Sequence, residues 1–289
     1  MHTAKIWLEA TRPKTLIAVV SPVLIANAMA MKIGFFDLRL FLFTLVTGLG
    51  IQIGTNLAND YFDCIKGADT INRKGPIRIT AAKLASPARV KYAFISVFAL
   101  TALAGTYLTF VGGPVLALLL TLAIILGIMY TGGPYPLAYL GLGDLFVLIF
   151  FGPVALLGAY YLQTKQLDTA ALLAGIAPGA LSNAILIINN LRDREEDRLA
   201  NKKTLVVRFG KVFGKVHYTA MLLIACSIPL LFWESHPLCM LASLSIIPAT
   251  MLITSVLRYK EGESLNSLLE KTGKLLFFYT LLFCLGWML

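Results

Sequence analysis

Nine long apolar segments restrict what this sequence can fold into. They cover residues 15–33, 39–59, 92–111, 113–131, 143–162, 169–190, 216–233, 238–257 and 275–289. About 20 mostly apolar residues cross a bilayer as a helix, and only 14% of the chain is charged, against about 25% in soluble domains. The first segment is longer than the apolar region of a cleaved signal peptide, so it is expected to be retained. The pattern predicts an all-α polytopic membrane protein with nine transmembrane helices in a single domain, residues 1–289.

The basic residues predict the orientation of these helices. Of the 25 Lys and Arg residues, all but Lys32, Arg39 and Lys165 fall on the side that holds residues 1–14 and the loops 60–91, 191–215 and 258–274. Cytoplasmic loops carry such an excess. The N-terminus is therefore expected in the cytoplasm and the C-terminus on the opposite side. The net charge of +10 is attributed to this topology and not to a nucleic-acid partner.

Two acidic clusters stand at predicted cytoplasmic ends of apolar segments. They hold seven of the fifteen Asp and Glu residues, in the segments 59–69 and 189–197. Carboxylates are costly near hydrocarbon, so a functional reason is expected. The residues interpreted as metal ligands are Asn59, Asp60, Asp63, Asp69, Asn189, Asp193 and Asp197.

The spacing of these residues suggests how they would act together. Asn189, Asp193 and Asp197 recur every four residues, which predicts one face of a helix, and Asn59 and Asp63 repeat the first step. A helix break at Lys66-Gly67 would let Asp69 fold back. Carboxylate and amide oxygens suit Mg²⁺, which shares its coordination sphere with substrate phosphates. The four aspartates Asp63, Asp69, Asp193 and Asp197 are therefore the predicted catalytic groups, with Mg²⁺ bridging to a diphosphate.

The same arrangement occurs twice along the chain. An Asn-x-x-x-Asp motif and a long basic loop follow a span at Asn59, and again four spans later at Asn189. This suggests two related units of about four helices plus one further helix.

Cations near the acidic clusters are candidate diphosphate ligands. They are Lys66, Arg78, Arg192, Lys202 and Lys203, and Arg would bind phosphate oxygens through two nitrogens. Two simpler explanations stay open: the carboxylates are salt-bridge partners of the basic loops, and most loop cations serve only topology.

A third cytoplasmic connection, residues 130–144, is almost uncharged. Tyr135 and Tyr139 are candidates for stabilising a cationic intermediate, with an aromatic belt at the membrane interface as the alternative. Asp144 heads the next span and is a candidate for orienting an acceptor hydroxyl or a lysine. His2, His217 and His236 are scattered and are interpreted as interfacial residues. The four cysteines form no C-x-x-C pair, so neither a disulfide framework nor a zinc site is indicated.

The motifs of this chain resemble those of the UbiA superfamily of intramembrane aromatic prenyltransferases. The first motif of that superfamily matches Asn59, Asp63 and Asp69, and the second matches Asn189, Asp193 and Asp197. The stretches 12–15, 66–69, 75–80, 189–193 and 203–208 resemble its 1,4-dihydroxy-2-naphthoate branch. The longer spacing from Asp63 to Asp69 disfavours the hydroxybenzoate branch, and Asn201 departs from a position where the family often has Gly.

The resemblance implies a fold, a reaction and partners. It implies helices around a central cavity that opens sideways to lipid, capped on the cytoplasmic side by the motif loops 60–91 and 191–215. It also implies Mg²⁺-dependent transfer of a polyprenyl group from polyprenyl diphosphate to dihydroxynaphthoate, with loss of CO₂, giving a demethylmenaquinone-type product and pyrophosphate. The partners would be these two substrates and the lipid bilayer.

Three alternatives are weighed against this function. A related enzyme with another acceptor (homogentisate, 4-hydroxybenzoate, chlorophyllide or haem) stays open. A transporter is disfavoured because transporters place charges near the bilayer midplane, whereas the carboxylates here stand at span ends. The motif of the CDP-alcohol phosphotransferases is not found in the sequence.

Overall fold

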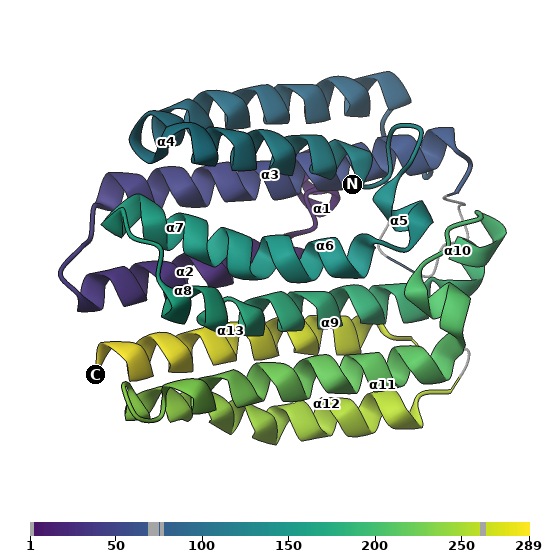
Figure 1. Cartoon of the computed structure of the whole chain (residues 1–289). Helices are drawn as coiled ribbons and strands as arrows, with labels where there is room; N and C mark the ends of the chain where they lie inside the picture. Colours follow the sequence, from purple (N-terminus) through teal and green to yellow (C-terminus); the bar gives the residue numbers. More distant parts are fainter. Residues whose placement is uncertain (1–2, 69–74, 76–77, 261–263) are drawn as a thin grey trace.

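The chain folds into a bundle of long, roughly antiparallel helices (Figure 1). The structure, a computed structural model, describes residues 3–68, 75, 78–260 and 264–289. The helices are α1 (Thr3–Ala10), α2 (Ile17–Lys32), α3 (Leu38–Ile65), α4 (Pro87–Met129), α5 (Leu137–Leu140), α6 (Gly143–Ile149), α7 (Ala155–Thr164), α8 (Thr169–Ala174), α9 (Ile176–Arg192), α10 (Arg194–Leu199), α11 (Leu205–Ser227), α12 (Ile246–Arg258) and α13 (Asn266–Met288).

Helix α4 reverses direction at one glycine. Gly113 has φ 75° and ψ −172°, a conformation that is essentially restricted to glycine, and Pro114 follows it. The two halves of α4 lie side by side (Figure 1). The boundary predicted between the segments 92–111 and 113–131 falls at this break.

The structure confirms an integral membrane protein. Six helical stretches are long and apolar enough to cross a bilayer among the described residues, or seven when the bent pair of α1 with its following turn and α2 is included. The helix 169–192 has 78% of its most apolar stretch buried, against 17–39% in the other five. It is therefore the central helix, and the outer helices present apolar faces to the surroundings, as lipid contact requires.

Close packing brings the broken helix α6–α7 against the central helix. The two halves of α6–α7 are joined by a π-helical turn, Phe150–Val154, that contains Gly152 and Pro153. A Cβ atom at Gly152 would lie 2.6 Å from the Gly175 carbonyl and 2.9 Å from the Gly179 Cα. Small residues permit such backbone contact between membrane helices. This contact fixes the wall of the cavity described below.

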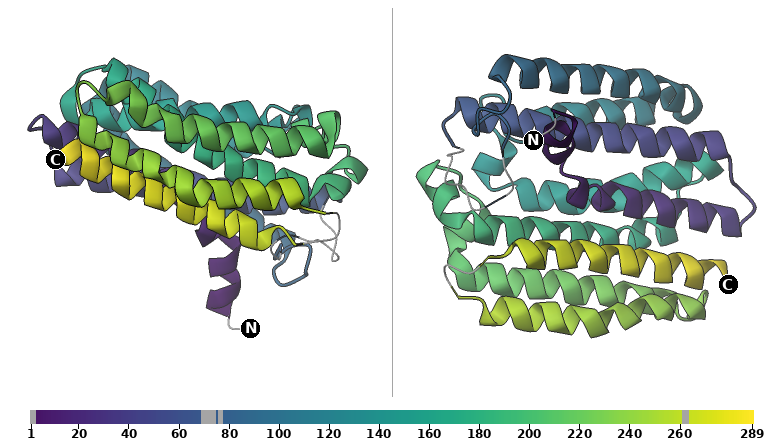
Figure 2. Two further views of the ribbon diagram at one scale, coloured as in Figure 1. Left: turned by 90° about the horizontal axis from the view of Figure 1, so that it is seen from below. Right: turned by 180° about the vertical axis from the view of Figure 1, so that it is seen from behind.

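The two ends of the bundle are marked by contacts of α13. Lys14, before α2, forms an ion pair with Glu270 at 2.7 Å, whereas Lys32, at the end of α2, donates to the Met288 carbonyl at 2.9 Å. Lys14 and the last residues of the chain thus lie at opposite ends of α13. Helix α1 projects from the bundle at an angle of 53° to α2 (Figure 2).

The motif segments differ from the prediction in one respect. Both were predicted as loops, 60–91 and 191–215, but α3 continues to Ile65, α10 occupies residues 194–199 and α11 begins at Leu205. The acidic residues therefore stand mainly on helix ends, which fix their positions more firmly than loops would.

Candidate active site at the mouth of a central cavity

A cavity of about 340 Å³ lies inside the bundle and has two kinds of wall. Its apolar wall includes Val19, Leu120, Phe150 and Leu162. Its polar wall includes Asn59, Asp63, Arg78, Asn189, Asp193, Asp197 and Lys202. A ligand with a charged head and an apolar body matches this division.

The first motif ends α3 in a defined cap. The Gly67 N–H donates to the Cys64 carbonyl and the Ala68 N–H to the Asp63 carbonyl, while Gly67 has φ 66°. These are the two hydrogen bonds and the left-handed residue of a Schellman motif. The predicted break at Lys66-Gly67 is confirmed. Asp69, which was expected to fold back there, lies outside the described residues.

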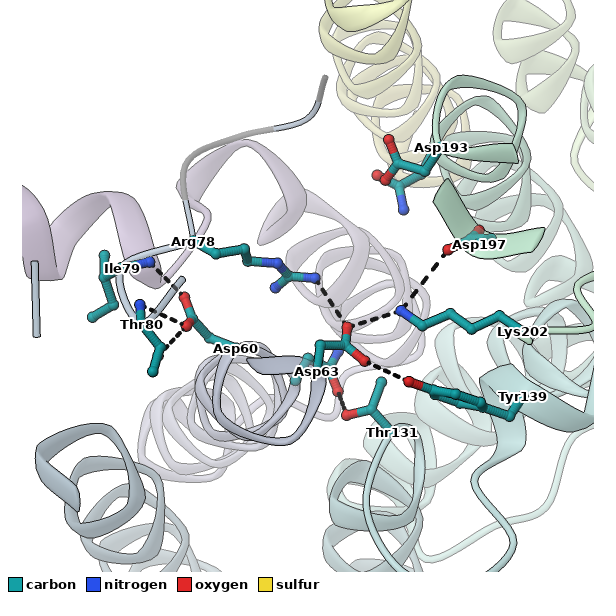
Figure 3. Close-up of polar contacts among 12 residues, drawn as sticks. Asp60, Asp63, Arg78, Ile79, Thr80, Thr131, Tyr139, Asp193, Asp197 and Lys202 are labelled. Carbon is teal, nitrogen blue, oxygen red and sulfur yellow. Dashed lines mark hydrogen bonds and ion pairs between the residues drawn. The ribbon is translucent and has the colours of Figure 1, made fainter. Parts of the chain in front are cut away.

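Asp63 is a buried carboxylate that meets three side chains of the site. It is 1% exposed. Its Oδ2 atom lies 3.0 Å from Lys202 Nζ and 3.5 Å from Arg78 Nη2, and Tyr139 donates to Oδ1 at 3.4 Å (Figure 3). Asn59, one turn earlier, accepts from Thr131 Oγ1 at 2.8 Å. Residues from three separate segments, at 78, 131–139 and 202, therefore hold Asn59 and Asp63.

The second motif does not lie on one uninterrupted helix, so that prediction is wrong. Helix α9 ends at Arg192, Asp193 has φ −92° and ψ 6°, and α10 begins at Arg194. The Asp193 N–H still donates to the Asn189 carbonyl and the Asp197 N–H to the Asp193 carbonyl. All three side chains consequently still reach the same cavity.

Lys202 joins the two motifs. Its Nζ lies 3.0 Å from Asp63 Oδ2 and 3.8 Å from Asp197 Oδ1, and Figure 3 shows it extended between the two carboxylates. The α10 cap places it there, because the Lys202 N–H donates to the Asp197 carbonyl and Asn201 adopts φ 57°. Asn tolerates this left-handed conformation, which explains how the chain manages without the glycine expected at position 201.

Arg192 binds residues of its own motif. Its guanidinium binds both oxygens of Asp193, at 2.6 and 2.8 Å, and donates to Asn189 Oδ1 at 2.5 Å and to Asn266 Oδ1 at 2.9 Å. It was predicted to bind diphosphate. The structure instead gives it the task of orienting Asn189 and Asp193.

Asp60 was predicted as a metal ligand, and the structure shows its carboxylate engaged with the backbone and side chain of another segment. Its carboxylate accepts from the Ile79 and Thr80 N–H groups, at 2.9 and 3.0 Å, and from the Thr80 hydroxyl. Figure 3 shows it pointing away from Asp63. With both oxygens occupied, Asp60 anchors the segment that presents Arg78 to the cavity.

Two other predicted residues, Lys66 and Tyr139, lie beside the cavity mouth. Lys66 donates to the Thr131 carbonyl at 2.6 Å and stands 4.7 Å above the Tyr139 ring, which also lies 5.4 Å from Lys202 Nζ. Tyr139 therefore faces two lysines, and its role with an allylic cation stays a prediction. Burial lowers the pKa of Lys66 and Lys202 lowers it further, while Asp63 raises it.

Two predicted residues fall away from the cavity. Tyr135 is 69% exposed. Lys203 is also exposed, and it contributes through its backbone, since its N–H donates to the Tyr139 carbonyl. Neither belongs to the cavity wall formed by the described residues. Their predicted roles in binding are not supported, because a solvated side chain cannot act inside a dry cavity.

Several cavity residues were missed or given no role by sequence reasoning. Arg12, Tyr130 and the rings of Phe146 and Phe150 line the cavity. Burial raises the pKa of Tyr130, and the nearby Asp144, Asp197 and Asp63 raise it further, so its hydroxyl remains a donor. Asp144, predicted to orient an acceptor hydroxyl or a lysine, lies in the cavity wall, and the Nδ1 atom of His217 is 3.8 Å from its Oδ1 atom. The sequence carried no signal that His217 would meet Asp144.

The donor atoms of this site suit a hard cation. Oxygens of Asn59, Asp63, Asn189, Asp193 and Asp197 converge on one cavity, and carboxylate and amide oxygens are what Mg²⁺ prefers. The ammonium of Lys202 already lies between carboxylates of the two motifs, so positive charge is favoured at this point. No group of three His, Cys, Asp or Glu side chains is gathered into a closed metal site within the part of the chain that the structure describes. An open site that shares its ion with a substrate needs no such group.

Comparison with known proteins agrees with this geometry. The model of the UbiA prenyltransferase family matches residues 19–287. The chain is 38% identical to the 1,4-dihydroxy-2-naphthoate octaprenyltransferase of Escherichia coli, over 97% of this chain and 94% of that protein. It is 35% identical to the protein of the same name from Mycobacterium tuberculosis, over 92% and 91%.

A solved structure shares the fold. The UbiA homologue of Archaeoglobus fulgidus bound to DMAPP and Mg²⁺ superposes with a TM-score of 0.59 at 15% identity, covering 98% of each chain. A helical membrane bundle with an acidic mouth over an apolar cavity defines the class of intramembrane prenyltransferases. The chain belongs to the UbiA prenyltransferase family.

Proposed function

We propose that this protein transfers a polyprenyl group from polyprenyl diphosphate to 1,4-dihydroxy-2-naphthoate, releasing CO₂ and pyrophosphate and forming demethylmenaquinone. The relatives in Escherichia coli and Mycobacterium tuberculosis, which cover nearly the whole chain, carry that activity in their names. The observation that carries the proposal is the meeting of both acidic motifs around Lys202, at the mouth of an apolar cavity. This is the arrangement that a diphosphate on a long lipid tail requires.

Mg²⁺ is the proposed cofactor. Asn59, Asp63, Asn189, Asp193 and Asp197 would hold it, together with Asp69. When bound, Mg²⁺ supplies charge that bridges carboxylates to diphosphate oxygens and stabilises the departing pyrophosphate. The protein's own contribution is orientation, since Arg192 fixes Asp193 and Asn189, and Thr131 fixes Asn59.

Cationic side chains are proposed to stabilise the leaving group. Lys202 and Arg78 already meet at Asp63, and both are more than nine-tenths buried. Charge–charge interactions are stronger in such a dry site than in water. Lys66 lies near them over Tyr139. These groups would lower the barrier to breaking the allylic C–O bond.

The apolar wall is proposed to hold the prenyl chain and to exclude water. Burial of each CH₂ group contributes about 0.8 kcal/mol, so a polyprenyl tail is bound without any polar contact. Phe146 and Phe150, whose ring centroids are 6.0 Å apart, line the cavity. Because both residues line the cavity, they are proposed in preference to the exposed Tyr135 to stabilise an allylic cation.

We further propose nine membrane crossings in a single domain over residues 1–289, with the two halves of α4 counted separately. The acidic mouth would form a cap on the cytoplasmic side, with the N-terminus on that side and the C-terminus opposite. Contacts of Lys14 and Met288 at opposite ends of α13 support this separation of the termini. The cavity would open laterally to lipid, because a polyprenyl chain is costly to expose to water.

The test uses purified protein in detergent with farnesyl diphosphate, Mg²⁺ and dihydroxynaphthoate, read by mass spectrometry. Hydroxybenzoate and homogentisate are supplied in parallel. The expected product is a prenylated and decarboxylated naphthoquinol or quinone that forms only with dihydroxynaphthoate and disappears with EDTA. Product with another acceptor alone would overturn the choice of acceptor, and no product from folded protein would overturn prenyl transfer.

A further inference from the structure

A buried acid, Asp144, and a largely buried histidine, His217, face each other beside the cavity, on helices other than those that carry the two acidic motifs. Asp144 stands in the first turn of α6 and lines the cavity. His217 stands on α11, and its Nδ1 lies 3.8 Å from Asp144 Oδ1. Their side chains are 5% and 16% exposed. The wall therefore places Asp144 toward the cavity, with His217 beside it.

Neither facing atom has its hydrogen bond. Among the described residues, both Asp144 Oδ1 and His217 Nδ1 are buried atoms without a hydrogen-bond partner. A buried unsatisfied polar atom costs about 1–3 kcal/mol, so two of them facing each other need an explanation. A distance of 3.8 Å is short enough for a small side-chain movement to form the hydrogen bond once a proton lies between them.

We propose that Asp144 is the acid–base group for the aromatic acceptor and that His217 is its positioning residue. This inference rests on the proposed function. Asp144 takes the proton of an acceptor hydroxyl as the ring becomes a nucleophile, and His217 stabilises the protonated carboxyl by hydrogen bonding. Tyr130 lies on the same wall, with its hydroxyl 2.9 Å from the position that a Cβ atom would take at Gly143, the residue before Asp144.

The reaction balances without a net proton. An electron pair of the ring carbon that bears the carboxylate forms the bond to the allylic carbon, while the hydroxyl proton moves to Asp144. The allylic C–O bond breaks and its electron pair leaves with pyrophosphate. Loss of CO₂ then returns an electron pair to the ring, and Asp144 returns the proton to the oxygen. A buried acid that holds one proton between two steps suits this sequence.

The test is a double-mutant cycle on Asp144→Asn and His217→Gln. We expect Asp144→Asn to lower kcat for dihydroxynaphthoate by about 10²–10⁴-fold, the usual contribution of a positioned acid or base. His217→Gln is expected to lower kcat by about 10-fold with little change in the acceptor KM. The double variant should be no slower than Asp144→Asn, because His217 acts only through Asp144. Binding of farnesyl diphosphate with Mg²⁺, followed by calorimetry, should match the wild type in every variant.

Matched controls lie outside the cavity wall. Glu234→Gln changes an exposed acid, and His236→Gln changes a histidine that stacks on Trp287 at 3.9 Å; both should transfer at the wild-type rate. If Asp144→Asn does not fold, the rates of transfer by Asp144→Glu and His217→Gln test the inference instead. Asp144→Glu is then expected to keep partial activity.

Three results would overturn the inference. They are transfer by Asp144→Asn within threefold of the wild type, losses that multiply in the double variant, and an equal loss of farnesyl diphosphate binding. Wild-type product in the same assay keeps the proposed function in place whichever result is found.

Discussion

The two acidic motifs look alike in sequence, but the structure builds them differently. Asn59 and Asp63 of the first lie on an unbroken α3 and receive their partners from elsewhere, with Lys202, Arg78 and Tyr139 all converging on Asp63. The second is divided between α9 and α10 at Asp193 and carries its own organiser, the neighbouring Arg192. The first is thus held by tertiary contacts and the second mainly by a local one.

The helix caps of the two motif segments correspond in a way that the sequence motifs do not indicate. Helices α3 and α10 each end in a Schellman cap. In each cap the carbonyl of an aspartate, Asp63 in α3 and Asp197 in α10, accepts a hydrogen bond from the N–H five residues later. The residue in the left-handed conformation is Gly67 in one cap and Asn201 in the other. Alignment of the two Asn-x-x-x-Asp motifs pairs Asp63 with Asp193. The positions of the caps instead pair Asp63 with Asp197. The two carboxylates that share Lys202 are therefore the two that stand at the caps.

The largest expected difference between the motifs is the loss of kcat/KM when a carboxylate of each is replaced. Asp63→Asn removes the group that faces Lys202, Arg78 and Tyr139 together, and we expect kcat/KM for prenyl transfer to fall about 10³-fold, or about 4 kcal/mol. Asp193→Asn should cost about 10²-fold, since Arg192 retains Asn189. The measurement is steady-state transfer with each variant. Glu195→Gln, which changes an exposed acid in the same cluster, is the control, and equal losses in all three variants would contradict the comparison.

Substitution of Arg192 tests whether a local contact holds the second motif as tertiary contacts hold the first. Arg192→Lys keeps the charge but loses the two-nitrogen contact with Asp193. We expect kcat/KM to fall about 10–100-fold, with the half-saturating Mg²⁺ concentration raised by a similar factor, because an oriented ligand is lost. Arg78→Lys, at the first motif, should instead raise the KM for polyprenyl diphosphate. A Mg²⁺ dependence unchanged by Arg192→Lys would show that Arg192 does not organise the metal site.

Asp60 tests whether the first motif depends on the segment that carries Arg78. Asp60→Asn weakens the hydrogen bonds to Ile79 and Thr80, and bonds to a charged group contribute about 1.5–3 kcal/mol. The thermal unfolding midpoint should fall, and transfer should drop about 10-fold through the displaced Arg78. A metal ligand would behave otherwise, with a marked change in Mg²⁺ dependence and an unchanged unfolding midpoint.

The smallest expected effect compares the two caps. Gly67→Ala puts a side chain at φ 66° with no atom within 4 Å of the new Cβ, so the cost of about 1 kcal/mol is conformational alone. Asn201→Gly relieves the same constraint and should be neutral or slightly stabilising. Thermal unfolding of both variants in one detergent checks this. A gain in stability for Gly67→Ala would contradict the cap assigned to α3.

The sequence predicted most of what depends on local pattern. The apolar segments lie within helices, and the break at Gly67 is where it was expected. The described residues of both motifs line one cavity, and their role as metal ligands stays a prediction. What the sequence could not predict are the contacts made across the fold. Asp60 and Asp63 are three residues apart, yet Asp60 accepts from the backbone of residues 79 and 80, whereas Asp63 lines the cavity and meets Lys202, Tyr139 and Arg78 there. Likewise, the pairing of Arg192 with its neighbour and of His217 with Asp144 depends on helix rotation and packing that no spacing rule specifies.

The central claim is that the two motifs form one site for one diphosphate. It is tested by calorimetric titration of farnesyl diphosphate, with Mg²⁺ present, into the wild type, Asp63→Asn, Asp197→Asn and the double variant. A single site predicts that each single variant loses most of the Mg²⁺-dependent affinity and that the double variant loses little more. Losses in binding free energy that add in the double variant, or full affinity in either single variant, would show that the motifs act separately and would contradict the account.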